Sequence, residues 1–184
     1  MFTNRKEAGN LLAKKLIEFS NNKDALIVAI PRGGLPVGAA IAEKLKLPLD
    51  IVLSKKIGHP LNKEYAIGAV TLKNSILTTD MQGVSREYIE EETQNIRALL
   101  QKRFKMYYGN KKPKSFKDKI IIVVDDGVAT GNTLISSVQL IEMENPSKII
   151  VALPVAPKSA LNRIATLTTV NKMVCLITPT IFNA

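Results

Sequence analysis

Two neighbouring aspartates, Asp125 and Asp126, directly follow a run of β-branched residues at 120–124. Such a run predicts a buried strand. Like charges at the end of a buried strand repel each other and gain nothing from packing. They become favourable where they meet a cation or a diol, because a carboxylate accepts hydrogen bonds from hydroxyl groups. The pair therefore predicts a site for a diol or a cation at the end of this strand.

A turn of small residues and two threonines follows the aspartates and leads into a predicted helix that begins near residue 132. Such a turn exposes backbone N–H groups and a helix N-terminus, which bind a phosphate dianion. Diol acceptors followed directly by a phosphate cup describe a site for ribose 5-phosphate. The candidate residues are Asp125, Asp126, Gly127, Val128, Ala129, Thr130, Gly131, Asn132 and Thr133.

Three other phosphate or aspartate motifs fit the sequence less well. The P-loop string G-x-x-x-x-G-K-[ST] does not occur, and glycines 33, 34 and 38 do not have the G-x-G-x-x-G spacing. A response-regulator receiver also has a strand that ends in two aspartates, but it needs more sheet downstream than the chain after Asp126 provides.

A second candidate loop, Pro31-Arg32-Gly33-Gly34, follows an apolar run at 25–30. Its glycines allow the backbone to approach a ligand closely, and Arg32 presents a fork of donors that suits phosphate. A plain glycine turn after a strand is the alternative interpretation.

The polar stretch 55–64 contains three further candidates and is predicted to be an exposed loop. Lys56 and Lys55 are candidate catalytic cations, although paired loop lysines are commonly just solvated. Glu64 is a candidate proton carrier or a solvated glutamate. The role of His59, the single histidine, is left open.

Apolar strands that alternate with helices predict an α/β fold whose mostly parallel sheet has helices on both faces. Ligands of such sheets bind at the carboxyl ends of the strands, where the candidate loops lie. The predicted strands are 25–30, 50–53, 120–124, 148–153 and 173–177, with 66–72 as a further candidate. The predicted helices are 4–20, 35–46, 85–108 and 132–143.

The chain has 184 residues and a formal net charge of +10, which favours polyanionic ligands. Only 5% of residues are aromatic, so nucleic acid is a disfavoured partner that is left open. One cysteine excludes an internal disulfide. No apolar run approaches the roughly 18–20 residues that cross a bilayer, and the N-terminus lacks a secretory signal. We therefore expect a cytoplasmic protein without membrane association.

The segment 123–133 resembles the phosphoribosyl pyrophosphate (PRPP) motif of type I phosphoribosyltransferases along its whole length. The resemblance implies that family's fold, as one domain over residues 1–184 with a small hood from about 1–20 and 173–184. It also implies that Asp125 and Asp126 hold the ribose hydroxyls and that residues 129–133 surround the 5-phosphate.

The segment Pro31-Arg32-Gly33-Gly34 is similar to the family's pyrophosphate loop, which implies a cis peptide bond between Pro31 and Arg32. The stretch after Ser54 resembles the mobile catalytic loop, which implies that Lys56, with Lys55 as second choice, closes over the pyrophosphate. Arg32 and Glu64 complete the expected catalytic set. Mg²⁺ is the expected cofactor, held mainly through substrate and water, with Asp125 and Asp126 as candidate ligands.

Segments 4–9, 30–34 and 62–70 are similar to a bacterial group of predicted phosphoribosyltransferases, some of them fused to hydrolase domains. The resemblance implies transfer of ribose 5-phosphate from PRPP to a nitrogen acceptor, a homodimer, and a role in nucleotide salvage. Ala129 replaces the aspartate typical of 6-oxopurine enzymes, which disfavours hypoxanthine and guanine. The alternative is a PRPP- or nucleotide-sensing regulatory protein of the same fold, with RNA as a candidate partner.

Overall fold

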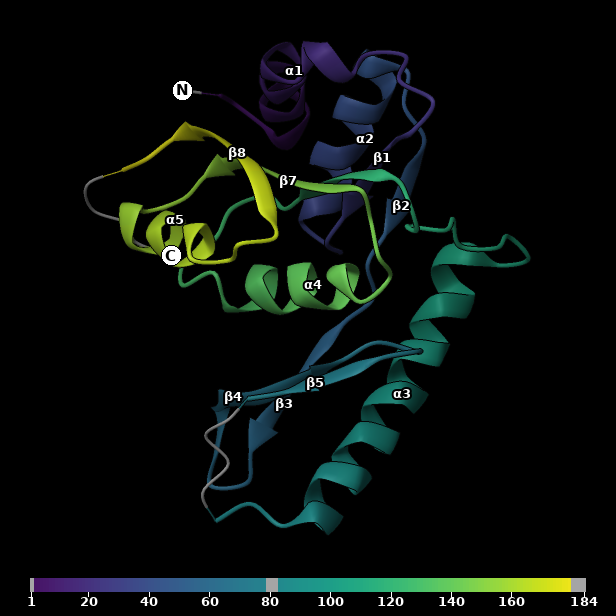
Figure 1. Cartoon of the computed structure of the whole chain (residues 1–184), viewed down its shortest axis with the longest axis vertical. Coiled ribbons are helices and arrows are strands. Elements are labelled where there is room, and N and C mark those ends of the chain that lie inside the picture. Colours follow the sequence, from purple (N-terminus) through teal and green to yellow (C-terminus); the bar gives the residue numbers. More distant parts are fainter. Residues whose placement is uncertain (1, 79–82, 180–184) are drawn as a thin grey trace. The chain divides into compact units, whose positions relative to one another are not determined.

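The computed structural model describes residues 2–78 and 83–179 (Figure 1). The chain forms two compact units. The sheet unit comprises Met1–Val52 and Lys114–Ala184, and the hairpin unit comprises Leu53–Pro113. The expected single domain over residues 1–184 remains a prediction.

The sheet unit is built on five parallel strands in the order β2-β1-β6-β7-β8. All five predicted strands in this unit are present, with ends shifted by a few residues. Their bounds are β1 Ala25–Ala29, β2 Leu49–Ile51, β6 Ile120–Val124, β7 Lys148–Val155 and β8 Val170–Ile177.

Helices cover both faces of this sheet (Figure 1). The β-branched strands alternate between two cores, because successive side chains of a strand point to opposite faces. In β6, Ile121 and Val123 pack with α4 and α5, whereas Ile122 and Val124 pack with α1 and α2. The helices are α1 Arg5–Lys15, α2 Gly34–Leu45, α4 Asn132–Glu142 and α5 Lys158–Ala165, and a short 3₁₀ helix, Ile17–Phe19, follows α1.

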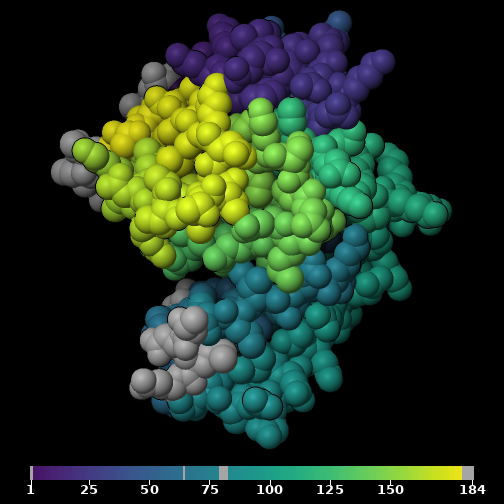
Figure 2. All heavy atoms as spheres, in the orientation of Figure 1, coloured from purple at the N-terminus to yellow at the C-terminus, as the bar shows by residue number. Residues whose placement is uncertain are grey.

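Segments from the two ends of the chain lie side by side in the sheet unit. Helix α1 contacts β8, and Glu18 forms an ion pair with Lys172. Figure 2 shows the purple N-terminal atoms packed against the yellow C-terminal ones. The expected hood from about 1–20 and 173–184 remains a prediction, and its residues 180–184 lie outside the described residues.

The hairpin unit consists of a three-stranded antiparallel sheet, in the order β3-β4-β5, and one long helix. Its core joins strand residues Ile57, Ile67 and Val70 to Ile96 and Leu100 of the helix. The elements are β3 Lys55–His59, β4 Asn62–Val70, β5 Ser75–Leu77 and α3 Arg86–Tyr108.

The expected exposed loop over 55–64 is therefore wrong, because most of this stretch forms β3 and the start of β4. An antiparallel sheet with one face exposed to solvent tolerates many polar residues. Ile57 is fully buried, whereas Lys55 and Lys56 are exposed. The polar composition thus indicates a solvated face of a hairpin and not an absence of regular structure.

Among the helices of residues 2–78 and 83–179, none is long and apolar enough to cross a membrane.

Candidate functional site

The two candidate loops of the sheet unit leave neighbouring strands at the same edge of the sheet. Strands β1 and β6 are parallel, and Ala29 lies opposite Val124 at their carboxyl ends. One residue further, the Ile30 N–H donates a hydrogen bond of 2.8 Å to the carbonyl of Val124. The strand register therefore brings residues 31–34 against residues 125–126.

The glycine pair allows this close approach. A Cβ atom added to Gly33 would lie 2.2 Å from Oδ2 of Asp126, and one added to Gly34 would lie 2.6 Å from the carbonyl oxygen of Val124. Real Cβ contacts are essentially never this short. Glycine is needed here for space, since Gly33 has an ordinary φ of −64°.

The peptide bond between Pro31 and Arg32 is cis, which confirms the expectation from the loop resemblance. The Arg32 side chain is exposed at the surface of the sheet unit. After the cis bond the chain passes directly into α2, which begins at Gly34. The loop thus presents one cation and a helix N-terminus from a segment of four residues.

Asp125 has an unusual titration for a carboxylic acid. Loss of solvent around this side chain raises its pKa to about 7, and the negative charge of Asp126 adds to the rise. A hydrogen bond of 2.8 Å from the Asp126 backbone N–H to Oδ1 of Asp125 acts in the opposite direction. Asp125 therefore exchanges its proton near neutral pH, and a cation or a hydroxyl donor beside it would favour its charged form.

Asp126 forms an ion pair with Arg5. The Arg5 Nε and Nη2 atoms both donate to Oδ2 of Asp126, at 2.9 and 2.7 Å. The Asp126 side chain keeps 28% of its surface exposed, so a ligand can still reach it. The first turn of α1 thus contributes a cation to the aspartate pair.

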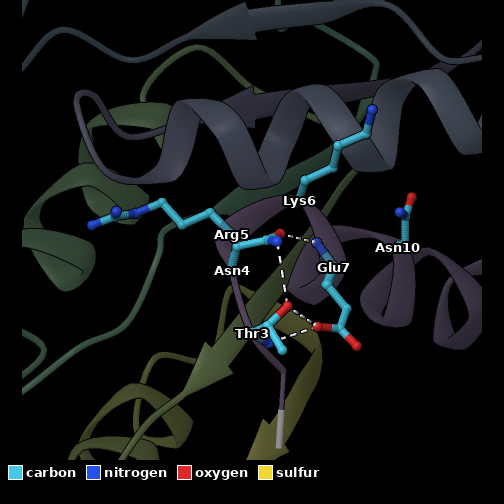
Figure 3. A pocket seen from close by; sticks show the side chains of 6 residues that line it. All are labelled: Thr3, Asn4, Arg5, Lys6, Glu7 and Asn10. Carbon is cyan, nitrogen blue, oxygen red and sulfur yellow. Dashed lines mark hydrogen bonds between the residues drawn. The ribbon is translucent and has the colours of Figure 1, made fainter.

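A network at the start of α1 fixes the segment that carries Arg5 (Figure 3). The backbone and hydroxyl of Thr3 donate to Oε2 of Glu7 at 2.6 and 2.7 Å, and these bonds lower the pKa of Glu7. Asn4 caps the helix by accepting from the Glu7 N–H at 2.9 Å. Thr3, Asn4, Arg5, Lys6, Glu7 and Asn10 line a pocket at this end of the helix.

The predicted phosphate loop, 129–133, joins β6 to α4. Gly131 is the N-cap of α4 and has a φ of +82°, a conformation that glycine adopts without strain. Arg163 of α5 donates from Nη1 to the carbonyl of Thr130 at 2.7 Å and from Nη2 to Oδ1 of Asn132 at 2.8 Å. The side chains of Ala129, Thr130, Asn132 and Thr133 are exposed.

The remaining predicted residues belong to the hairpin unit. Lys55 and Lys56 are in β3, opposite Val70 and Ala69 of β4. Glu64 is in β4, and its side chain lies outside the part that the structure describes. The sheet unit by itself brings together residues 31–34 and 125–133, and the roles of Lys55, Lys56 and Glu64 remain predictions.

His59, at the end of β3, has a local structural contact. Its Nδ1 atom accepts a hydrogen bond of 3.2 Å from the Leu61 N–H, and its ring lies edge-on to Tyr65 at 6.1 Å between centroids. These contacts stabilise the tight connection between β3 and β4.

The sequence and the fold match known proteins over almost the whole chain. The model of the phosphoribosyl transferase domain family matches residues 3–174. The chain belongs to this family.

The chain also matches a curated relative and solved structures. A Mycobacterium tuberculosis protein, provisionally named as a phosphoribosyl transferase, is 30% identical over the whole chain, which spans 42% of that protein. The crystal structure of TT1426 from Thermus thermophilus is 32% identical, with a TM-score of 0.88 over 100% of this chain and 87% of that one. The purine phosphoribosyltransferase of Pyrococcus horikoshii, 17% identical, matches 98% of this chain and 92% of its own with a TM-score of 0.50. These likenesses confirm the predicted type I phosphoribosyltransferase fold.

The aspartate pair of this phosphoribosyl transferase domain provides oxygen ligands of the kind that suit a hard cation. Carboxylate oxygens, as in Asp125 and Asp126, are the ligands that Mg²⁺ prefers, and this ion usually keeps several waters. Among the described residues there is no cluster of three or more histidine, cysteine, aspartate or glutamate side chains that could hold a metal. Asp125 and Asp126 are therefore the residues of this site whose oxygen atoms could bind Mg²⁺.

Two arginines of the site were not predicted from the sequence. Arg5 lies in the segment 4–9, which carries a family resemblance, but the resemblance gave this arginine no role. Arg163 lies outside every recognised motif, so the sequence held no signal for it. Both contacts join residues that are far apart in the chain, by 121 positions for Arg5 and Asp126 and by 33 for Arg163 and Thr130.

Proposed function

We propose that this chain transfers ribose 5-phosphate from PRPP to a nitrogen acceptor and releases pyrophosphate. The proposal rests mainly on the close contact of the two loops. The carboxylate of Asp126 lies so near Gly33 that no side chain would fit at position 33. The loop with Arg32 lies against Asp125 and Asp126, and residues 129–133 follow them. These three groups match the pyrophosphate, the ribose hydroxyls and the 5-phosphate of PRPP. The whole protein's activity is part of the proposal, because the chain spans less than half of its Mycobacterium tuberculosis relative.

Each loop has a separate part in the proposed complex. Asp125 and Asp126 accept hydrogen bonds from the ribose 2′- and 3′-hydroxyls. Both bonds from Arg5 go to Oδ2 of Asp126, so we assign Oδ1 to the ribose. Residues 129–133 surround the 5-phosphate through their backbone N–H groups and the start of α4. Residues 31–34, with the Arg32 cation, bind the pyrophosphate.

The reaction breaks the bond between ribose C1 and the pyrophosphate oxygen and forms a bond between C1 and the acceptor nitrogen. Negative charge grows on the leaving group, and Arg32 and Lys56 stabilise it. The acceptor loses one proton, for which Glu64 is the proposed carrier. Mg²⁺, when bound with the substrate, would neutralise part of the pyrophosphate charge.

The acceptor is a nucleobase or a related amine. Ala129 places a methyl group at the position where 6-oxopurine enzymes typically carry an aspartate. We therefore expect hypoxanthine and guanine to be poorer acceptors than other bases. We further propose that the enzyme is a cytoplasmic homodimer that acts in nucleotide salvage.

A second candidate function is a regulatory protein that binds PRPP or a nucleotide and contacts RNA. The net charge of +10 favours it, because such a field attracts nucleic acid. Binding of a single-stranded RNA probe that weakens steeply with salt would support this candidate.

The test is phosphorus NMR of PRPP, Mg²⁺ and a panel of purine, pyrimidine and amine acceptors with the full chain. Asp125→Asn/Asp126→Asn serves as the control. Acceptor-dependent release of pyrophosphate that the control lacks would establish the transferase and name its acceptor class. PRPP binding without release from any acceptor would favour the regulatory candidate, and binding of neither PRPP nor a nucleotide would contradict both.

A further inference from the structure

Arg163 connects helix α5 to both sides of the predicted phosphate loop. Its Nη1 atom donates to the Thr130 carbonyl at 2.7 Å, and its Nη2 atom donates to Oδ1 of Asn132 at 2.8 Å. Thr130 and Asn132 flank Gly131, the residue with the left-handed backbone. One planar guanidinium thus bridges the loop across its sharpest turn.

Helix α5 also supports the loop through its apolar face. A Cβ atom added to Gly131 would lie 3.8 Å from Ala160 and from Ile164, one helical turn apart on α5. Ala160 and Ile164 belong to the same core as Val128 before the loop and Leu134 after it. The apolar face of α5 therefore lies directly beside Gly131, and Arg163 holds the Thr130 carbonyl and the Asn132 side chain.

The contact to Thr130 determines where a neighbouring donor points. The carbonyl of Thr130 and the N–H of Gly131 share one planar trans peptide, so they point in opposite directions. Because Arg163 holds the carbonyl, the Gly131 N–H is directed away from the Arg163 guanidinium. Arg163 is exposed, so its positive charge also remains available beside the loop.

We propose that Arg163 is a positioning residue for the 5-phosphate. It orients the peptide between Thr130 and Gly131, holds the Asn132 side chain and adds a positive charge beside the loop. This inference rests on the proposed function, since it assigns residues 129–133 to the phosphate of PRPP. It extends the site to a helix that no sequence motif marks.

The test compares ligands that differ in the 5-phosphate. Ribose 5-phosphate, PRPP and inorganic pyrophosphate are titrated with the full chain in Mg²⁺, as wild type, Arg163→Ala, Arg163→Lys and Lys158→Ala. Lys158 is an exposed cation of the same helix, so Lys158→Ala matches the loss of one charge. The thermal midpoint of each variant is measured alongside.

We expect Arg163→Ala to weaken ribose 5-phosphate and PRPP about tenfold, in line with the loss of charge-assisted hydrogen bonds. Pyrophosphate affinity stays unchanged, Lys158→Ala binds like wild type, and Arg163→Lys recovers part of the loss. Wild-type affinity in Arg163→Ala would overturn the inference, as would an equal loss for pyrophosphate together with a lower thermal midpoint. If wild type bound neither ribose 5-phosphate nor PRPP, the proposed function would fail as well.

Discussion

The two units carry their candidate residues in different ways. In the sheet unit, residues 31–34 and 125–126 follow adjacent parallel strands, and the strand register and two glycines hold them together. In the hairpin unit, Lys55 and Lys56 stand exposed on a short strand whose contribution to the apolar core is Ile57. In the proposed function the sheet unit supplies the contacts to the ligand, whereas the hairpin supplies positive charge. We therefore expect changes in the first to alter affinity and changes in the second to alter turnover.

The largest effect that tests this division is expected from Lys56→Ala. Removing a cation that stabilises the leaving group lowers kcat by about 100- to 1,000-fold. The Kd for PRPP changes little, because the sheet unit supplies the proposed binding contacts. Lys55→Ala is the matched control and lowers kcat less. Steady-state kinetics and PRPP titration measure the two quantities, and a loss of PRPP affinity in Lys56→Ala would break the division.

Alanine substitution at one glycine of each unit tests the same division between affinity and turnover. In Gly33→Ala the new methyl group would lie 2.2 Å from the Asp126 carboxylate, so PRPP affinity falls about 10- to 100-fold. In Gly58→Ala the methyl would lie 2.4 Å from the carbonyl of Lys63, which distorts the hairpin and lowers kcat instead. Equal losses of affinity in both variants would show that the units do not divide these roles.

A smaller effect concerns pH and the buried carboxyl of the sheet unit. The pKa of Asp125 is about 7 in the folded chain, against an ordinary value of 3.8. Between these values the folded state holds a proton that the unfolded state has released, so this group's contribution to stability falls as pH rises from about 4 to 7. Asp125→Asn removes that loss, and its stability relative to wild type should therefore increase from about pH 5 to about pH 8.

Urea unfolding of wild type and Asp125→Asn at the two pH values measures this difference. The same titration makes PRPP binding tighten as pH rises through about 7, because the carboxylate form accepts the ribose hydroxyls. Parallel pH dependences of stability in the two proteins would show that Asp125 does not titrate in this range.

The smallest effect is expected in the hairpin unit from Tyr88→Phe. The Tyr88 hydroxyl donates to the Gly58 carbonyl at 2.7 Å and lies 2.6 Å from Nζ of Lys63, and it thereby ties α3 to the hairpin. Its loss costs about 1 kcal/mol of unfolding free energy. Tyr107→Phe is a suitable control, because no hydrogen bond to the Tyr107 hydroxyl is found within residues 2–78 and 83–179. A change of equal size in the control would remove the assigned role of Tyr88.

The same contrast explains what the sequence could predict. Residues 123–133 are consecutive, so the motif, its strand and its helix are read together, and the parallel strands then place Pro31 to Gly34 beside them. The pairing of Arg5 with Asp126 depends on how α1 packs, which no local pattern encodes. In the hairpin unit, the polar composition of residues 55–64 gave no sign of a strand. A short strand with a solvent-exposed face needs only one buried side chain, here Ile57, to pack on the core.

The most direct test of the central claim is a calorimetric titration of PRPP into the full chain in Mg²⁺, compared with Asp125→Asn/Asp126→Asn. In the proposed complex, Asp125 and Asp126 of the sheet unit bind the ribose of PRPP. The predicted result is saturable binding by wild type that the double variant loses while its fold is retained. Undiminished binding by the double variant would place the ligand elsewhere and contradict the account.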